Sequence, residues 1–195
     1  MYIEPCCYEK QLSELLMGIE GKSDVAHFFS NSDWDLNDLL PYFVNKVPGC
    51  ELTLCLVNVE QNVLETLRKL LARMIPNPET RQAMNLISHL TLITQGNNRK
   101  EVLDYLKNVS DERLSVCEDN IGFRCMTCTD GKRHFVLQGS LNQRILSSTQ
   151  LFTLTTGSKL YKEVQGVLDS KHRVKRIKDW KTAYERIVKQ NQPNN

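Results

Sequence analysis

The spacing of apolar residues predicts two helices at the start of the chain, followed by a strand–helix unit. Before Pro48, apolar residues recur at helical spacing over residues 12–19 and 36–44, which is typical of amphipathic helices. Residues 52–59 are apolar at nearly every position, which predicts a buried strand in a sheet that is covered on both faces. A helix over residues 62–74 follows, and a strand followed by a helix is typical of a parallel sheet.

The strand–helix unit repeats once and then gives way to short strands. Residues 89–94 form the next predicted strand, and residues 98–109 carry apolar side chains on one helical face. Further strands are predicted over residues 113–118, 123–129, 133–138 and 150–155, and a closing helix begins near Ser158. Asp130-Gly131 is a strong hairpin signal between two of these strands. The pattern predicts an α/β fold with a mixed β-sheet and helices on both faces.

Composition places the chain among ordinary globular proteins. Its 195 residues are 41% hydrophobic and 25% charged, which excludes the disordered, coiled-coil and fibrous classes. We expect an N-terminal helical segment over 1–47, an α/β core over 48–170, and a basic C-terminal helix with a frayed tail over 171–195. The apolar runs are shorter than the roughly 20 residues of a membrane span. Because the first residues carry no secretion signal, we expect a cytoplasmic protein with no membrane partner.

Positive charge is concentrated near the C-terminus. Between residues 159 and 189 there are ten Lys or Arg against four Asp or Glu, although the net charge of the whole chain is only +2. This distribution favours an anionic partner such as nucleic acid, and a solvated helical face explains it equally well. The cations that we expect to contact a nucleic-acid backbone are Lys171, Arg173, Lys175, Arg176 and Lys178.

One motif carries a resemblance to a known family. Asp130 is followed, at the end of the predicted hairpin, by Gly139-Ser140-Leu141-Asn142. The segment follows two predicted strand–helix units. With this position in the chain, it resembles the second part of the phospholipase D signature, HxKxxxxD followed by GSxN. The resemblance covers approximately residues 48–170 and implies a phospholipase D-like fold. It also implies that Asp130, Ser140 and Asn142 are the remainder of a phosphate-binding site.

The residues that perform the chemistry in that family are replaced in this chain. In the family, the histidine of HxK attacks phosphorus and the lysine holds the phosphate. Counting back from Asp130 places Phe123 in the histidine position and Cys125 in the lysine position. Phenylalanine cannot act as the nucleophile, and cysteine does not replace a permanent cation. The resemblance therefore implies a degenerate, single-half member without catalytic residues, and we expect no enzyme activity.

Other residues do not restore a site. His134 and Ser140 share a face of their predicted strand, but their separation of about 20 Å is too long for a catalytic pair. Cys125 and Cys128 form a CxxC pattern, yet positions i and i+3 of a strand face opposite sides, so we expect no metal site. No glycine-rich phosphate loop follows a strand, so we expect no cofactor. We interpret the seven cysteines as free thiols rather than a disulfide framework.

Three functions remain open at this point. The first is an inactive phospholipase D-like module that binds nucleic acid or another phosphodiester. The second is a protein-interaction or homodimerisation module, because single-half members of this family pair two copies to build their site. The third is an active phosphodiesterase or nuclease with a rearranged site. The fold alone does not choose among these functions.

Overall fold

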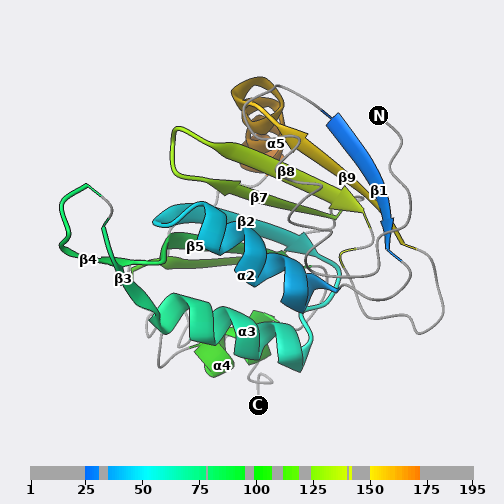
Figure 1. The fold of residues 1–195 in the computed structure, drawn as a ribbon. Helices are drawn as coiled ribbons and strands as arrows, with labels where there is room; N and C mark the ends of the chain where they lie inside the picture. The colour runs from blue at the N-terminus through cyan, green and yellow to red at the C-terminus, as the bar shows by residue number, and fades with distance from the viewer. Residues whose placement is uncertain are drawn as a thin grey trace, which may run out of the picture.

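The helices and strands are arranged in layers around one mixed sheet (Figure 1). The computed structural model of the protein describes residues 25–30, 35–77, 79–94, 99–106, 112–118, 124–139, 141 and 150–171. Its strands are β1 (Val25–Ser30), β2 (Cys50–Leu56), β3 (Met74–Pro76), β4 (Ala83–Asn85), β5 (Ile87–Thr94), β6 (Leu114–Glu118), β7 (Cys125–Thr129), β8 (His134–Gly139) and β9 (Gln150–Thr156). Its helices are α2 (Leu36–Lys46), α3 (Gln61–Ala72), α4 (Arg99–Leu106) and α5 (Ser158–Lys171).

The main sheet joins a parallel half to an antiparallel half. Its seven strands lie in the order β1-β9-β8-β7-β2-β5-β6, and β3 with β4 forms a separate ribbon. β2, β5 and β6 are parallel, because α3 and α4 return the chain between them. From β2 outward, β7, β8, β9 and β1 pair antiparallel. The predicted α/β fold with a mixed sheet is confirmed.

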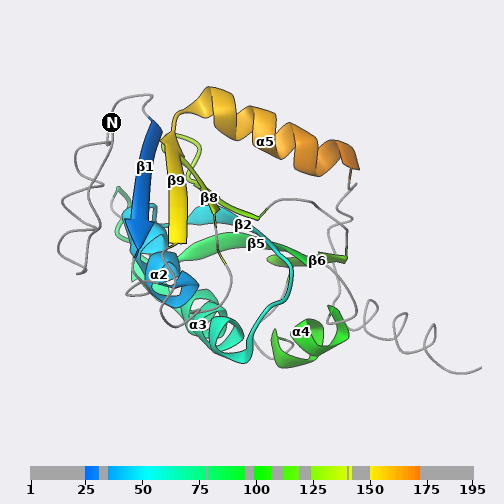
Figure 2. The ribbon, with the colours of Figure 1, turned by 90° about the vertical axis from the view of Figure 1, so that its right-hand side faces the viewer.

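Helices cover both faces of the sheet, as predicted. Figure 2 shows α2, α3 and α4 on one face and α5 on the other. Along β2, Leu54 faces the larger core under α2 and α3, and Cys55 faces a smaller cluster under α5. Because both faces of β2 are covered, the strand is apolar at nearly every position, which is the pattern from which it was predicted.

A capping box fixes the start of α2. The backbone N–H of Asn37 donates to Asp35 Oδ1 at 2.7 Å, and the N–H of Asp35 donates to Asp38 Oδ2 at 3.0 Å. Pro41 lies inside this helix and removes one backbone donor. The helix nevertheless continues to Lys46, because its apolar face, which includes Phe43, is buried in the larger core.

Two structural elements were not predicted from the sequence. β1 is the edge strand beside β9, and its position depends on pairing with a segment far along the chain. The β3–β4 ribbon begins at Met74, the last residue of the helix predicted over 62–74. The predicted helix over 12–19 and the basic segment after Lys171 lie outside the described residues. The division of the chain into its three segments therefore stays a prediction.

Substitution of Gly139, at the end of β8, tests how closely β8 and β9 approach each other. Its φ is +144°, and a Cβ at this position would lie 2.4 Å from the Leu151 carbonyl oxygen and 3.1 Å from Phe152 Cα. We expect Gly139→Ala to lower the free energy of unfolding by about 3 kcal/mol or more, because backbone strain and overpacking act together. Urea unfolding followed by circular dichroism measures this loss.

Gly166 provides the matched control. It lies in α5, and a Cβ there would meet nothing within 4 Å. Gly166→Ala should stabilise the protein by up to about 1 kcal/mol, since alanine restricts the unfolded chain and favours the helix. Equal effects of the two substitutions would show that the approach of β9 to Gly139 is looser than the structure indicates.

Candidate functional site

Two described residues of the motif positions, Cys125 and Gly139, lie at one edge of the sheet. The carboxyl ends of β2, β5, β6 and β8 share this edge with the beginning of β7. Cys125 at the start of β7 is paired with Gln138, next to Gly139. In open α/β sheets, ligands bind at the carboxyl edge of the strands. Cys125, in the lysine position, and Gly139, the first residue of GSxN, therefore lie near each other at the edge where a ligand is expected.

Cys125, in the lysine position, is buried in the interior of the protein. It is 0% exposed and packs under α5 with Cys55, its register partner on β2, and with Val164 and Leu168 of α5. The hydrogen bond with Cys55 and burial both raise the pKa of the Cys125 thiol, so that it stays neutral. Phe123, in the histidine position, lies outside the described residues. The lysine position thus supplies no positive charge to a phosphate.

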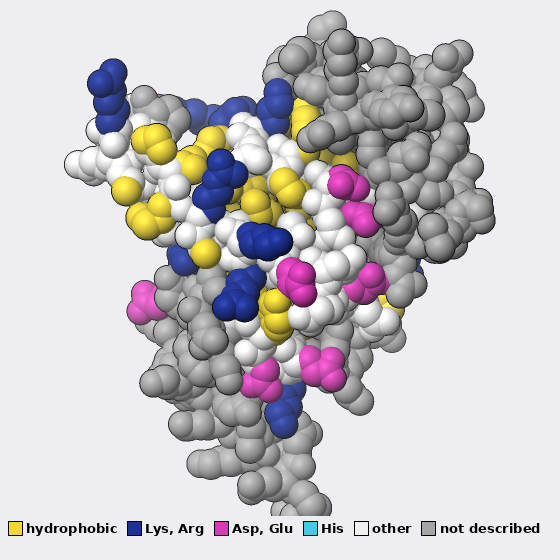
Figure 3. All heavy atoms as spheres, turned by 60° about the horizontal axis from the view of Figure 1, so that its bottom comes forward, with side chains coloured by type: hydrophobic (Ala, Val, Ile, Leu, Met, Phe, Trp, Pro, Cys, Tyr) yellow, Lys and Arg dark blue, Asp and Glu magenta, His cyan; other side chains and the backbone are white. Residues whose placement is uncertain are grey.

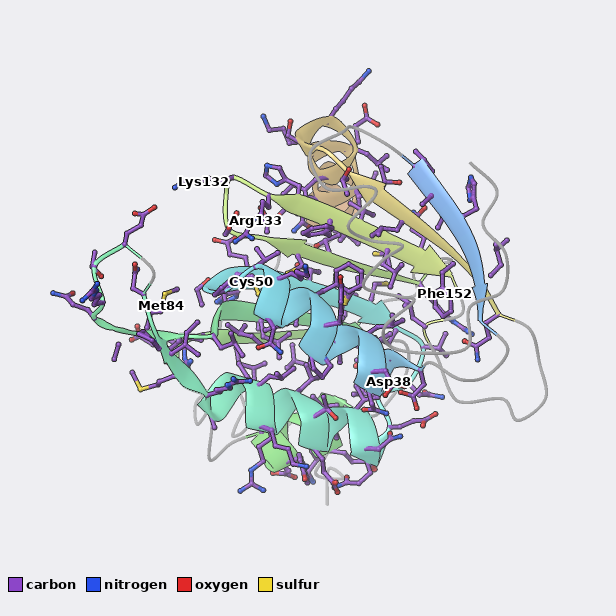
Figure 4. All side chains as sticks on the ribbon, viewed as in Figure 1. Asp38, Cys50, Met84, Lys132, Arg133 and Phe152 are labelled. Atoms are coloured by element: carbon purple, nitrogen blue, oxygen red, sulfur yellow. The ribbon has the colours of Figure 1, made fainter. Side chains whose placement is uncertain are left out.

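Asp130 lies at the opposite end of the hairpin from Gly139. Its Oδ1 accepts the backbone N–H groups of Lys132 at 2.9 Å and Arg133 at 2.7 Å, and its Oδ2 accepts the Arg133 Nη2 at 2.8 Å. Burial alone would raise the pKa of Asp130, but these hydrogen bonds and the guanidinium charge hold it below its usual value. Figure 4 shows Lys132 and Arg133 far from Phe152, the register partner of Gly139. Asp130 is therefore positioned as a turn residue.

The GSxN segment is described at only two of its positions. Leu141 is buried in the larger core, and its N–H donates to the Gly139 carbonyl oxygen at 2.9 Å. Ser140 and Asn142 themselves lie outside the described residues. The structure therefore brings Gly139 to the carboxyl edge without bringing Asp130 there.

The histidines in the described part of the chain contact hydroxyl groups on neighbouring strands. His134 Nδ1 lies 2.8 Å from Thr129 Oγ1, and its ring stacks on Tyr161 with 4.8 Å between centroids. His89 Nε2 lies 3.1 Å from Ser115 Oγ, a pair that sequence reasoning missed because it depends on the pairing of β5 with β6. Ser115 is completely buried, so its hydroxyl is inaccessible to a substrate.

The CxxC pattern is divided between the two faces of the sheet, as its spacing predicted. Cys125 lies in the cluster with Cys55, whereas Cys128 lies in the larger core, where it is hydrogen-bonded to Cys50. That hydrogen bond and burial raise the pKa of Cys128. Among the described residues there is no group of three or more His, Cys, Asp or Glu that could hold a metal ion.

A hollow of about 430 Å³ lies between α3 and α4. Its apolar floor includes Val59 and Leu64, and its polar lining includes Gln61, Glu101 and Asp104. Near the start of α3, burial and the charge of Asp35 raise the pKa of Glu60. These carboxylates disfavour a phosphate in the hollow, because like charges repel.

Of the cations predicted to contact nucleic acid, only Lys171 is among the described residues. Lys171 is the last residue of α5, and its side chain is not described. Arg173, Lys175, Arg176 and Lys178 lie outside the described residues. The described helices include none that is long and apolar enough to cross a membrane.

Comparison with known proteins shows a similarity of fold to solved structures, without a match to a protein family or to a curated protein. Phosphatidylserine synthase from Haemophilus influenzae Rd KW20 is 12% identical with a TM-score of 0.51, over 85% of this chain and 44% of the synthase. Polyphosphate kinase from Porphyromonas gingivalis is 12% identical with a TM-score of 0.50, over 83% of this chain and 28% of the kinase. TrmBL2, an archaeal chromatin protein with a novel mode of DNA binding, is 11% identical with a TM-score of 0.46, over 84% of this chain and 59% of that protein.

The similarity to the synthase and the kinase confirms the fold that the motif implied. Both have phospholipase D-superfamily folds, and this chain resembles them in its mixed sheet and helices. The chain spans less than half the length of each. At 12% identity, the similarity shows a common fold and does not transfer either activity.

The role of Asp130 as a turn residue predicts a pH-dependent loss of stability. At pH 7, Asp130→Ala should lower the free energy of unfolding by about 1–3 kcal/mol, because two backbone N–H groups and Arg133 lose their acceptor. Asp130→Asn should cost less, since it keeps an acceptor. A lowered folded-state pKa stabilises the fold above the unfolded value of about 3.9, and this contribution is lost as pH falls through the folded value.

Chemical unfolding of both variants between pH 7 and pH 2 measures the effect. The difference between wild type and Asp130→Asn should shrink at acid pH, where the wild-type carboxylate is also neutral. Full stability of Asp130→Asn at pH 7, together with lost binding of inorganic phosphate, would instead identify Asp130 as a phosphate ligand.

Proposed function

We propose that this phospholipase D-like fold is a catalytically inactive module that binds nucleic acid or another phosphodiester. The burial of Cys125 carries the proposal of inactivity. In the lysine position the chain has a neutral thiol that packs under α5 beside Cys55. A phosphate near Gly139 would therefore meet no cation from this position of β7. Phosphoryl transfer depends on electrostatic stabilisation of the phosphate, so this loss removes a principal catalytic contribution.

We assign most of the binding affinity to the basic C-terminal stretch. Ser140 and Asn142, as the remainder of the phosphate site, carry neutral donors, which orient a phosphate but attract it weakly at a distance. The carboxylates of Glu101 and Asp104 around the hollow oppose an anion there. The clustered cations between Lys171 and Lys178 provide the attraction that the pocket lacks. The proposal includes a cytoplasmic location and requires no cofactor.

Homodimerisation is the second candidate function, and the edge strand β1 favours it. β1 pairs on one side with β9. Val25 of β1 and Leu151 of β9 are each 47% exposed, although both are large apolar side chains. An edge strand with exposed apolar residues can pair with a second copy. This arrangement would extend the sheet and would be compatible with nucleic-acid binding by the C-terminal stretch.

The purified protein should not hydrolyse phosphodiesters. Incubation with bis(p-nitrophenyl) phosphate and with single-stranded and duplex DNA, with EDTA present, should release no more product than buffer alone. Metal-independent hydrolysis that Ser140→Ala or Asn142→Ala abolishes would contradict the inactive assignment and favour a rearranged active site. Hydrolysis that both variants retain would indicate a contaminating enzyme, because the catalytic machinery of the family would then be uninvolved.

Reversal of three C-terminal cations should weaken DNA binding much more than Ser140→Ala. Each phosphate contact with Lys or Arg contributes about 0.9 to the slope of log K against log salt. The variant Arg173→Glu/Lys175→Glu/Arg176→Glu should therefore bind at least about tenfold more weakly near 0.1 M salt and show a flatter slope. Fluorescence anisotropy with a labelled 20-base-pair duplex measures both quantities.

A charge-matched variant shows whether a loss of DNA affinity comes from lost contacts in the C-terminal stretch or from the change in net charge. Lys100, Lys159 and Lys162 are exposed on α4 and α5, so their reversal to Glu changes the net charge equally. This control should retain most of the affinity. Circular dichroism must show that both variants are folded, because Ile177 and Trp180 lie close to the altered positions. Equal losses in the two variants would refute a dominant C-terminal contact, and the absence of wild-type binding at low salt would favour the interaction module.

A further inference from the structure

The β3–β4 ribbon projects from the main sheet at the end opposite Gly139. Its inward face consists of Ile75 and Met84, which are register partners. Ile75 packs against the larger core, and Met84 Cε occupies the space where a Cβ on Gly49 would lie, at 2.2 Å. Figure 4 shows Met84 on the ribbon, on the same side of the molecule as Lys132. The ribbon is thus anchored along one face.

The outward face of the ribbon has exposed apolar side chains. Met74 is 60% exposed, and Pro76 with its register partner Ala83 is also exposed. An isolated two-stranded ribbon is only marginally stable, so the packing of its inward face stabilises it. Its outward face takes no part in this packing. Figure 3 shows hydrophobic side chains gathered on this part of the molecule with Lys and Arg side chains around them. The outward face is therefore available to a partner.

Local hydrogen bonds hold the ribbon and its tip in a defined conformation. At the base, the Leu86 N–H donates to the Arg73 carbonyl oxygen at 2.9 Å. At the tip, Asn77 Oδ1 accepts the N–H groups of Glu79 at 2.8 Å and Thr80 at 3.0 Å. Arg81 follows in the left-handed region, with φ of 58°. The tip therefore presents Arg81 from a backbone that is already ordered before any partner binds.

The charges on the ribbon are positive and exposed. Arg73 at its base and Arg81 at its tip have no acidic partner among the described residues, whereas Glu79 is paired with Lys132 at 3.1 Å. The guanidinium of Arg73 also donates to Asn45 Oδ1 at 3.3 Å, which orients it without neutralising it. An exposed cation at each end of a short ribbon fits a partner with regularly spaced negative charges.

We propose that the β3–β4 ribbon is a second nucleic-acid contact, which inserts into the major groove of duplex DNA. Arg73 and Arg81 contact phosphates on the walls of the groove, and Met74 on the outward face contacts the methyl groups of thymine bases. A two-stranded ribbon fits the major groove of B-form DNA, which is about 12 Å wide. This inference rests on the proposed nucleic-acid binding and adds to it a surface that the C-terminal stretch does not supply.

Charge reversal on the ribbon tests this interaction in the full chain. Arg73→Glu/Arg81→Glu should weaken binding of a labelled 20-base-pair DNA duplex at least about tenfold near 0.1 M salt. It should also lower the salt slope by about 0.9 for each phosphate that the variant no longer neutralises. Lys159→Glu/Lys162→Glu on α5 is the matched control, because it makes the same change in net charge at exposed positions. Met74→Ser should weaken binding without changing the salt slope, since it removes no charge.

Hydrogen–deuterium exchange provides a readout that does not depend on substitutions. Addition of the unlabelled duplex should slow exchange in residues 73–86, and the slowing should be absent in Arg73→Glu/Arg81→Glu. Equal affinities of the ribbon variant and the control, with the wild type binding DNA, would overturn the ribbon contact and leave the proposed function intact. Failure of the wild type to bind DNA would overturn both. Protection of the ribbon at high protein concentration without DNA would assign it to an interface between copies of the chain and overturn the proposal.

Discussion

The antiparallel pairing of β2 with β7 fixes the positions of Cys125 and of the Asp130 turn. It joins the parallel strand–helix half to the antiparallel half, with Leu52 opposite Cys128 and Cys55 opposite Cys125. Because side chains alternate along a strand, a slip by one residue would exchange the faces of Cys125 and Cys128. The observed register directs Cys125 under α5, and it places the Asp130 turn at the end of the hairpin away from the carboxyl edge.

The packing of α5 explains why the missing lysine could not be restored by one substitution. In the middle of α5, Gln165 Nε2 donates to Thr53 Oγ1 at 3.3 Å and to Thr127 Oγ1 at 3.4 Å. Nearby, α5 covers Cys55 and Cys125 with Val164 and Leu168. A lysine at position 125 would place an unpaired charge in this dry cluster, at a cost of about 3–5 kcal/mol, the usual range for an uncompensated buried charge. The surroundings of Cys125, and not only the residue itself, thus disfavour a cation at this position.

The sequence predicted the elements whose signal is local. The runs that became β2 and β5 are long and apolar, and α3 has a regular apolar stripe, so each was predicted with its type. The strands of the β3–β4 ribbon are short, and both the ribbon and β1 depend on partners that the local pattern does not specify. The motif likewise grouped Asp130 with Ser140 by distance along the chain, whereas the hairpin register separates Asp130 from the adjacent Gly139.

The distribution of charge over the helical face follows from helix electrostatics and constrains where an anion can bind. Asp38 and Glu101 lie in the first turns of α2 and α4, where carboxylates stabilise the positive end of the helix dipole. The same carboxylates cancel the attraction that a helix N-terminus would otherwise exert on a phosphate. Arg73 follows the carboxyl end of α3, and Arg81 lies at the tip of the ribbon. Under the proposed function, the attraction to an anionic partner therefore comes from cations outside the sheet edge at which Cys125 and Gly139 lie.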